Sequence, residues 1–149
     1  MSLQENIDKD IKSAMLSKDG ARLRGLRAIK AALLVAKTEK GASEIITEEA
    51  EIKVLQKLVK QRKESAEIYQ QQKRDDLFQI ELEEMQVIEA FLPKQMSREE
   101  LAAYIKNAIE RSGAESMKDM GKVMGLVNQE LAGKADGKTI SELVKELLA

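Results

Sequence analysis

The sequence predicts an all-α protein, and three observations support that fold class. Apolar residues recur every three or four positions along most of the chain, which is the spacing of one helix face. No stretch alternates apolar and polar residues with the period of two that marks a strand. The 149 residues include only one proline and eight glycines, so few positions interrupt a helix. We expect an N-terminal four-helix part, residues 1–93, followed by a C-terminal three-helix bundle, residues 94–149.

Capping and breaking residues delimit the four N-terminal helices. A capping box opens the first at Ser2, and Thr47 precedes a turn rich in acidic residues that opens the third. Asp76 is the predicted N-cap of the fourth helix, and Gly41 is the predicted end of the second. The fourth stops before Pro93, because a residue that precedes proline avoids the helical region. The predicted helices cover residues 2–19, 21–40, 47–72 and 76–92.

Three shorter helices are expected in the C-terminal part. Their predicted N-caps are Ser97, Ser116 and Thr139. Gly121 and Gly125 lie four residues apart in the middle helix, and small residues at that spacing let helix backbones approach closely. The predicted helices cover residues 97–112, 116–132 and 139–149, with a tight loop between the last two.

The residue types present restrict the chemistry. The chain has no cysteine and no histidine, which excludes disulfides and removes the commonest metal ligand and general base. It contains neither the Gly-x-x-x-x-Gly-Lys-Ser/Thr loop of nucleotide-binding ATPases nor a glycine-rich dinucleotide motif after a strand. We therefore expect no catalytic residue, no metal and no cofactor, and we expect that the chain on its own is not an enzyme.

The sequence also favours a cytoplasmic protein without a membrane partner. No apolar run approaches the roughly 20 residues that span a bilayer. The N-terminus lacks the apolar core of a signal peptide. The composition, 43% hydrophobic and 34% charged, is that of an ordinary soluble protein, and it leaves the oligomeric state open.

Two charged residues interrupt the apolar faces of the third and fourth helices. Arg62 lies four residues after Leu58 and four before Ala66, and Glu84 lies within the stripe of the fourth helix. That stripe consists of Leu77, Ile80, Val87, Ile88 and Phe91. In an antiparallel hairpin that turns near Arg74, the two charges differ in height by about 3 Å. Because a charge among apolar neighbours is costly unless it is paired, we predict a buried Arg62–Glu84 ion pair. One alternative is a polar ligand pocket or a paired acid/base site at the same place. The other is that the stripe is not fully covered and Arg62 reaches solvent.

The net charge of −1 hides a segregation of basic residues along the chain. Residues 20–40 hold six basic residues and one acid, and residues 53–63 add five basic residues with no acid between them. This distribution can build a cationic surface on a nearly neutral protein. The alternative is that the cations pair with acids on neighbouring helices.

Five strings follow one another along nearly the whole chain and together resemble a known family. They are Leu26–Leu33 with Arg27 and Lys30; Lys60–Ser65 followed by Tyr69, Arg74, Asp76, Leu77, Glu81 and Glu84; Phe91–Gln95; Asp119–Gly125; and Gly133–Gly137. In these residues, and in their order and spacing, the chain resembles the YqeY family, also called the GatB/YqeY domain family.

The resemblance implies an all-helical protein whose C-terminal part is similar to the tail domain of the B subunit of the glutamine-dependent tRNA amidotransferase. In that enzyme the tail helps to engage the tRNA body. The resemblance therefore implies a non-catalytic accessory protein that binds tRNA or related RNA by shape and charge. One alternative is a protein–protein module that docks the amidotransferase or another tRNA-associated complex. Another is a carbon–nitrogen ligase that uses glutamine as amido donor.

On the RNA-binding hypothesis, cations of both parts contact phosphate groups. Base readout is not expected, because the chain has only two tyrosines and two phenylalanines and stacking platforms need aromatic residues. Binding should consequently depend strongly on salt. Backbone amides near Ser116 and Thr139 could add donors. The predicted contacts are Arg22, Arg24, Lys53, Lys57, Lys60, Lys63, Lys122, Lys134 and Lys138.

Overall fold

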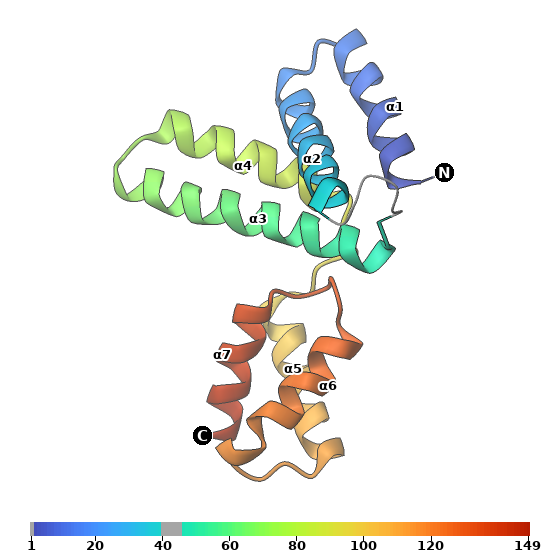
Figure 1. Cartoon of the computed structure of the whole chain (residues 1–149). Helices are drawn as coiled ribbons and strands as arrows, with labels where there is room; N and C mark the ends of the chain where they lie inside the picture. The colour runs from blue at the N-terminus through green and yellow to red at the C-terminus, as the bar shows by residue number, and fades with distance from the viewer. Residues whose placement is uncertain (1, 40–45) are drawn as a thin grey trace. The chain divides into compact units, whose positions relative to one another are not determined.

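The computed structural model describes residues 2–39 and 46–149, and it confirms the all-α class (Figure 1). Over those residues the regular structure consists of seven α-helices and one short 3-10 turn, without a strand. Contacts divide the chain into two units, Met1–Leu92 and Pro93–Ala149. The predicted helix end at Gly41 lies outside the described residues. Among the helices described, none is long and apolar enough to cross a membrane.

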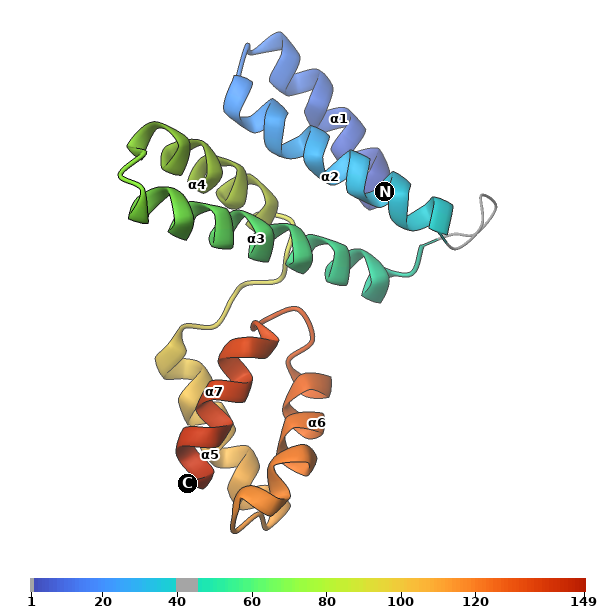
Figure 2. The ribbon, with the colours of Figure 1, turned by 60° about the vertical axis from the view of Figure 1, so that its left-hand side comes forward.

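The first unit contains two helical hairpins that share one core (Figure 2). Helix α1 packs along α2, α3 packs along α4, and α2 joins the hairpins by lying against α4 and α3. The helices are α1 (Leu3–Leu16), α2 (Gly20–Glu39), α3 (Glu48–Gln71) and α4 (Asp75–Glu89). The core takes fully buried side chains from all four: Ile7, Leu26, Ile29, Leu55 and Ile88.

Local hydrogen bonds explain where these helices begin. Ser2 forms the predicted capping box of α1, and the Thr47 side chain accepts a hydrogen bond at the start of α3. The predicted N-cap at Asp76 is wrong, because α4 already begins at Asp75. The Asp76 carboxylate instead accepts two hydrogen bonds of 3.2 Å from the guanidinium group of Arg74.

Most of the predicted α4 stripe is covered, but one member is not. Ile88 is fully buried, whereas Ile80 remains 39% exposed, so the apolar stripe is not buried along its whole length. Helix α2 approaches α4 closely at Val87, two turns after Ile80.

Gly25 sets the close approach of α2 to α4. A methyl group added at Gly25 would lie 2.7 Å from both Cβ and Cγ1 of Val87, closer than carbon atoms approach in proteins. Glycine inside a helix costs roughly 1 kcal/mol relative to alanine. Here the missing side chain makes room for the neighbouring helix. The crossing also brings Arg24 to the carboxylates of α4.

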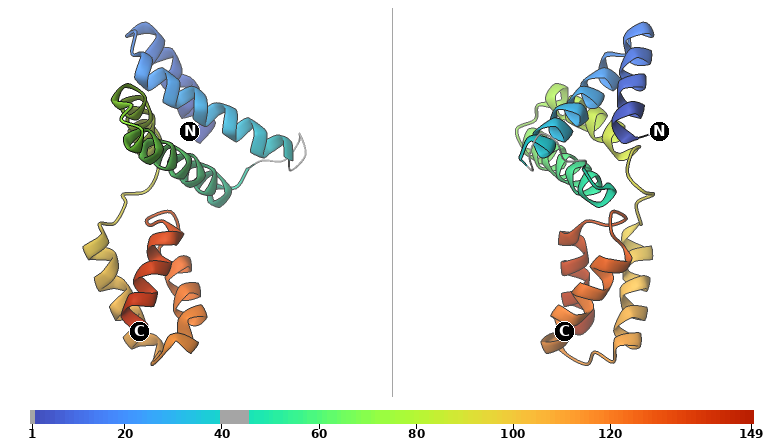
Figure 3. Two further views of the ribbon diagram at one scale, coloured as in Figure 1. Left: turned by 90° about the vertical axis from the view of Figure 1, so that its left-hand side faces the viewer. Right: turned by 45° about the vertical axis from the view of Figure 1, so that its right-hand side comes forward.

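The second unit is a bundle in which each of three helices contacts the other two (Figure 3). The helices are α5 (Arg98–Ser112), α6 (Met120–Glu130) and α7 (Gly137–Leu148), and a 3-10 turn, η1 (Met117–Asp119), leads into α6. Their buried faces form a second core that includes Leu101, Ile105, Val123, Val127, Ile140 and Val144.

The limits predicted for α5 agree with the structure. The Ser97 hydroxyl accepts a hydrogen bond from the amide of Glu100 at 3.1 Å. The helix ends at Ser112, and its C-cap Gly113 has a φ of 72°, in the left-handed region that glycine adopts most easily.

Three other predictions about this unit are wrong. Ser116 caps the 3-10 turn η1, and α6 begins only at Met120. Helix α7 begins at Gly137, before the predicted cap Thr139, because the Asp136 carboxylate accepts a hydrogen bond from an amide of the first turn. Gly121 and Gly125 are exposed, and a methyl group added at either would meet no described atom within 4 Å. They therefore make no close helix contact within the part of the chain that the structure describes.

Candidate nucleic-acid interface

Two of the predicted phosphate contacts lie on α2 and are joined to acids of neighbouring helices. Arg22 Nη2 lies 3.6 Å from Asp10 Oδ2 on α1. Arg24 Nη2 donates a hydrogen bond of 3.0 Å to Glu83 Oε2 on α4. Both arginines thus help to hold α2 against its neighbours, as the pairing alternative for this basic segment predicts.

The predicted contacts on α3 are placed differently. Lys53, Lys57, Lys60 and Lys63 are all exposed, away from the buried residues of the helix. Lys53 forms an ion pair of 3.6 Å with Glu49 one turn earlier. Within the described residues, the other three lysines form no ion pair. We call Lys57, Lys60 and Lys63 the lysine ridge.

The spacing of the lysine ridge concentrates positive charge. Residues three apart on a helix are surface neighbours, and each step of three advances about 4.5 Å along the axis. Like charges at such spacing destabilise a helix by a few tenths of a kcal/mol per pair. The ridge is short, because Glu64 and Glu67 follow it on the exposed side of α3.

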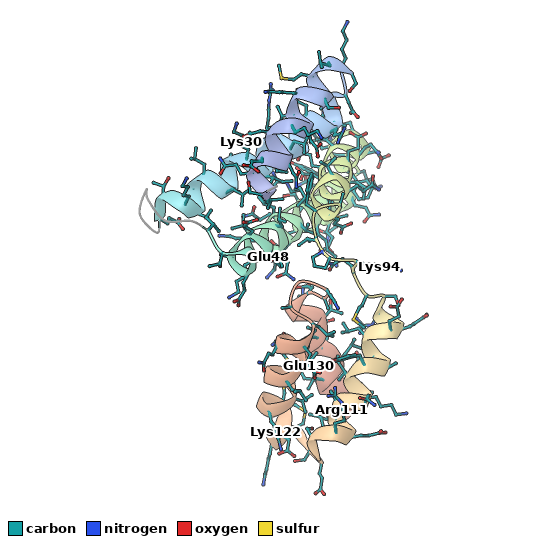
Figure 4. All side chains as sticks on the ribbon, turned by 90° about the vertical axis from the view of Figure 1, so that its right-hand side faces the viewer. Lys30, Glu48, Lys94, Arg111, Lys122 and Glu130 are labelled. Carbon is teal, nitrogen blue, oxygen red and sulfur yellow. The ribbon has the colours of Figure 1, made fainter. Side chains whose placement is uncertain are left out.

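In the second unit, one of the three predicted lysines is engaged within the fold. Lys122 Nζ, labelled in Figure 4, donates a hydrogen bond of 3.0 Å to the carbonyl oxygen of Ser112. Ser112 is the last residue of α5, so the ammonium group satisfies a free carbonyl at the negative end of the helix dipole. Lys134 and Lys138 are exposed on either side of Asp136, and within the described residues neither side chain has an ion-pair partner.

The backbone amides near Ser116 and Thr139, predicted as additional phosphate donors, lie where side-chain oxygens of the protein already accept hydrogen bonds. The Asp136 carboxylate occupies the first turn of α7, close to Thr139. The hydroxyl of Ser116 accepts a hydrogen bond from the Lys118 amide, and Asp119 accepts one from the Glu115 amide. A phosphate at α7 would therefore meet a negative charge, so the exposed lysines are the better anion contacts.

The residues of the predicted Arg62–Glu84 pair meet where α2, α3 and α4 come together. Arg62 Nε lies 3.7 Å from Glu84 Oε2, and Arg24 Nε lies 3.9 Å from the other oxygen of the same carboxylate. The side chains of Arg62 and Glu84 are 19% and 16% exposed, so the pair is mostly covered but is not buried as predicted. The distance of 3.7 Å is too long for a hydrogen bond, and Arg62 Nε is enclosed without a hydrogen-bond partner among the described atoms.

Glu81 shares this junction and makes it sensitive to pH. Burial raises the pKa of Glu81, the charge of Glu84 raises it further, and Arg62 partly offsets both. A carboxyl with a raised folded-state pKa binds its proton more tightly in the folded protein, so its contribution to stability falls as pH rises through that pKa.

Glu81→Gln should therefore be more stable than wild type at neutral pH. The difference in the free energy of unfolding should vanish below the ordinary carboxyl pKa, where Glu81 is protonated in both states. Urea denaturation of both proteins across this pH range measures the difference. A difference that is independent of pH would show that Glu81 ionisation does not act on stability.

Sequence reasoning missed a polar cluster that joins α5 to α6 (Figure 4). Arg111 donates hydrogen bonds of 3.4 and 3.1 Å to the two carboxylate oxygens of Glu130 and one of 2.7 Å to Asn107 Oδ1. Its guanidinium carbon lies 5.8 Å from the ring centre of Tyr104. The pKa of Tyr104 is raised, mainly by burial and then by the hydrogen bond with Glu130. The pKa of Glu130 is lowered by hydrogen bonds from Tyr104 and then Arg111. The four-residue spacing of Asn107 and Arg111 was the available sequence signal.

The lysine ridge, Lys134 and Lys138 carry positive charge that no described acid pairs with. Among the described residues, no group of three or more acids is placed to bind a metal. A phosphate group that meets these lysines displaces no described acid.

The family is decided by a match over nearly the whole chain. The model of the YqeY family, described as a Yqey-like protein, matches residues 4–148. The chain belongs to the YqeY-like family.

Similar proteins carry the name "Altered inheritance of mitochondria protein 41, mitochondrial". The relative from Pyrenophora tritici-repentis (strain Pt-1C-BFP) is 30% identical over 146 residues, which cover 95% of this chain and 78% of the relative. The relative from Clavispora lusitaniae (strain ATCC 42720) is 33% identical over 136 residues, which cover 88% and 77%. That name places those relatives in mitochondria, and the cytoplasmic location of the present chain stays a prediction.

Two of the strings that carried the resemblance meet in the second unit of this YqeY-like protein. Gln95 Nε2 donates hydrogen bonds of 2.8 Å to the Pro93 carbonyl and 2.6 Å to the Gly133 carbonyl. The Met96 amide donates one of 3.0 Å to the Lys134 carbonyl. Gly133 has a φ of 80°, which favours glycine. These strings therefore fix the loop that precedes α7 and position the backbone of Lys134.

Proposed function

We propose that this YqeY-like protein is a non-catalytic accessory protein of tRNA metabolism that binds tRNA or related RNA through phosphate contacts. The lysine ridge carries the proposal. Its three exposed lysines are neighbours on one helix and have no ion-pair partner among the described residues. The lysines of this row repel one another, although Glu64 and Glu67 lie one turn after Lys60 and Lys63. The concentration of the lysines on one exposed face favours a role in binding an anionic partner.

The structure separates the predicted phosphate contacts into exposed residues and residues that already have a partner. Lys134 and Lys138 offer further exposed charges in the second unit. Arg22, Arg24 and Lys122 have partners within the fold and would have to leave them to bind phosphate. Tyr104 is partly covered by Arg111 and so is a poor stacking surface, which favours binding independent of base sequence.

RNA binding is tested by fluorescence anisotropy with labelled tRNA at low and physiological salt. We expect binding at low salt that weakens strongly as salt is added. Replacing Lys57, Lys60 and Lys63 together by glutamate should lower the low-salt affinity by at least about tenfold, because three phosphate contacts become repulsive.

The matched control carries the same change in net charge at scattered sites. Lys12, Lys106 and Lys145 are exposed on three other helices, and replacing all three by glutamate should have a much smaller effect. Absence of binding at low salt would contradict the proposal. If both triple variants lose the same affinity for tRNA, the loss comes from the change in net charge and not from the lysine ridge.

One observation favours the second candidate function, docking of a tRNA amidotransferase or another tRNA-associated protein complex. Gly121 and Gly125 are exposed inside α6, where each costs roughly 1 kcal/mol relative to alanine and meets no described neighbour. Glycine at such positions permits the backbone of a partner to come close. Affinity capture from nuclease-treated lysate separates the candidates, since a partner bridged by RNA is lost and one bound directly is retained.

A further inference from the structure

Helix α2 is apolar on two opposite faces. Between residues 28 and 36 every residue except Lys30 is apolar. Leu26, Ile29 and Leu33 on one face are buried in the core of the first unit. A helix that is apolar around its whole circumference is normally buried on all sides. Here the second face is open.

The open face has the spacing of a helix-docking surface. Leu34 and Val35 are 61% and 56% exposed, and Ala31 and Thr38 beside them are also exposed. These four residues follow the pattern i, i+3, i+4, i+7, which places them in one stripe of the helix labelled α2 in Figure 2. We call Ala31, Leu34, Val35 and Thr38 the outer face of α2. Contiguous exposed apolar residues of this kind mark interaction sites.

The charges beside the outer face are positive. Arg27 continues the stripe one turn before Ala31, and Lys30 and Lys37 fall along one edge of it. Glu39 is the only acid of α2. Lys30 is engaged by Asp8 of α1 at 2.7 Å. Arg27 is exposed and Lys37 is partly exposed, and within the described residues neither forms an ion pair. A complementary surface therefore needs apolar residues in the middle and acidic residues along one side.

We propose that the outer face of α2 docks an amphipathic helix of a partner protein that carries acidic residues along one edge. The apolar residues of that helix would cover Leu34 and Val35, and its carboxylates would meet Arg27 and Lys37. This site lies on a different helix from the lysine ridge, and the inference does not rest on RNA binding.

Other occupants fit the outer face less well. Phosphate groups gain nothing from Leu34 and Val35. Helices that lie in a membrane surface insert a face of tryptophan, phenylalanine or leucine, and the outer face offers only Leu34 and Val35 as large apolar side chains. In an antiparallel pair of α2 helices from two copies of the chain, the same edges meet, so the cations would face one another.

The probe is a fluorescein-labelled synthetic peptide of three heptads, with leucine at the first and fourth positions of each heptad and glutamate at one of the two flanking positions, so that the acids lie along one edge. A matched peptide has lysine in place of glutamate. The full chain should bind the glutamate peptide at least about tenfold more tightly than the lysine peptide. The double substitution Leu34→Glu and Val35→Glu should lower that affinity by at least about tenfold, and Arg27→Glu should lower it severalfold.

Leu16→Glu is the matched control, because Leu16 is 86% exposed at the end of α1, outside the outer face. It should leave the affinity unchanged within about twofold. Circular dichroism checks the fold of each variant, and Leu34→Ser with Val35→Thr replaces the glutamate pair if that pair unfolds the chain.

The proposal is overturned if both peptides bind equally, if neither binds, or if the double variant keeps its affinity. The occupant of the outer face is a lipid surface or a second copy of the chain if the protein binds vesicles or itself more tightly than the glutamate peptide and the double substitution abolishes that binding. Sedimentation with phosphatidylglycerol–phosphatidylcholine vesicles detects the first. Analytical ultracentrifugation detects the second.

Discussion

Gly25→Ala is expected to destabilise the first unit by about 1–2 kcal/mol, although alanine is the better helix former. The added methyl group would lie 2.7 Å from two carbon atoms of Val87, so α2 and α4 must move apart or Val87 must shift. Overpacking of this kind costs about 1–3 kcal/mol, and the gain in helix propensity returns at most about 1 kcal/mol. Urea denaturation followed by circular dichroism measures the change.

Two other glycines and one double variant provide the controls. Gly121→Ala and Gly125→Ala place the same methyl group in open space and should each stabilise the protein by about 0.5–1 kcal/mol. Gly25→Ala should be tolerated better when Val87→Ala removes the clashing atoms, so the two substitutions should not be additive. A Gly25→Ala protein that is more stable than wild type would show that the helices do not cross closely at this point.

Glu84→Met is expected to destabilise the first unit by about 1–3 kcal/mol, because it leaves a mostly covered arginine without its carboxylate. Arg62 lies 3.7 Å from Glu84, and its side chain is only 19% exposed. Glu83→Met is the matched control. Glu83 is 35% exposed and meets a largely exposed Arg24, so its loss should cost less than about 1 kcal/mol.

A double variant separates the ion pair from the packing around it. Replacing Arg62 and Glu84 together by methionine removes both charges and keeps comparable volume, so most of the lost stability should return. Urea denaturation of the two single variants and the double variant completes the cycle. Additive losses would show that the two residues act independently and that their predicted pairing is not energetically relevant.

The sequence was sufficient where the cause of a structure is local. Ser2, Thr47 and Ser97 cap helices as predicted, because a capping hydrogen bond forms between residues three apart in the chain. Arg62 and Glu84 were found from the interruption of two apolar stripes. That signal works when two helices form a hairpin, because their relative height follows from the position of the turn.

The sequence was insufficient where the cause lies in another helix. The residues around Gly25 in the sequence show only a helix in which glycine is unfavourable. The close approach of Val87 on α4 explains why glycine occurs there. Ile80 continues an apolar stripe, yet it remains 39% exposed, two turns before the close approach of α2. Charge counting likewise could not separate Arg24, which reaches an acid on α4, from Lys60, which reaches none among the described residues.

The most direct test of phosphate binding by the lysine ridge is the salt dependence of tRNA affinity. Each phosphate contact contributes just under one unit to the slope of log affinity against log salt concentration. Lys57→Gln, Lys60→Gln and Lys63→Gln together should reduce the magnitude of that slope by about 2–3 units relative to wild type. An unchanged slope, with or without a change in affinity, would mean that RNA does not contact the ridge.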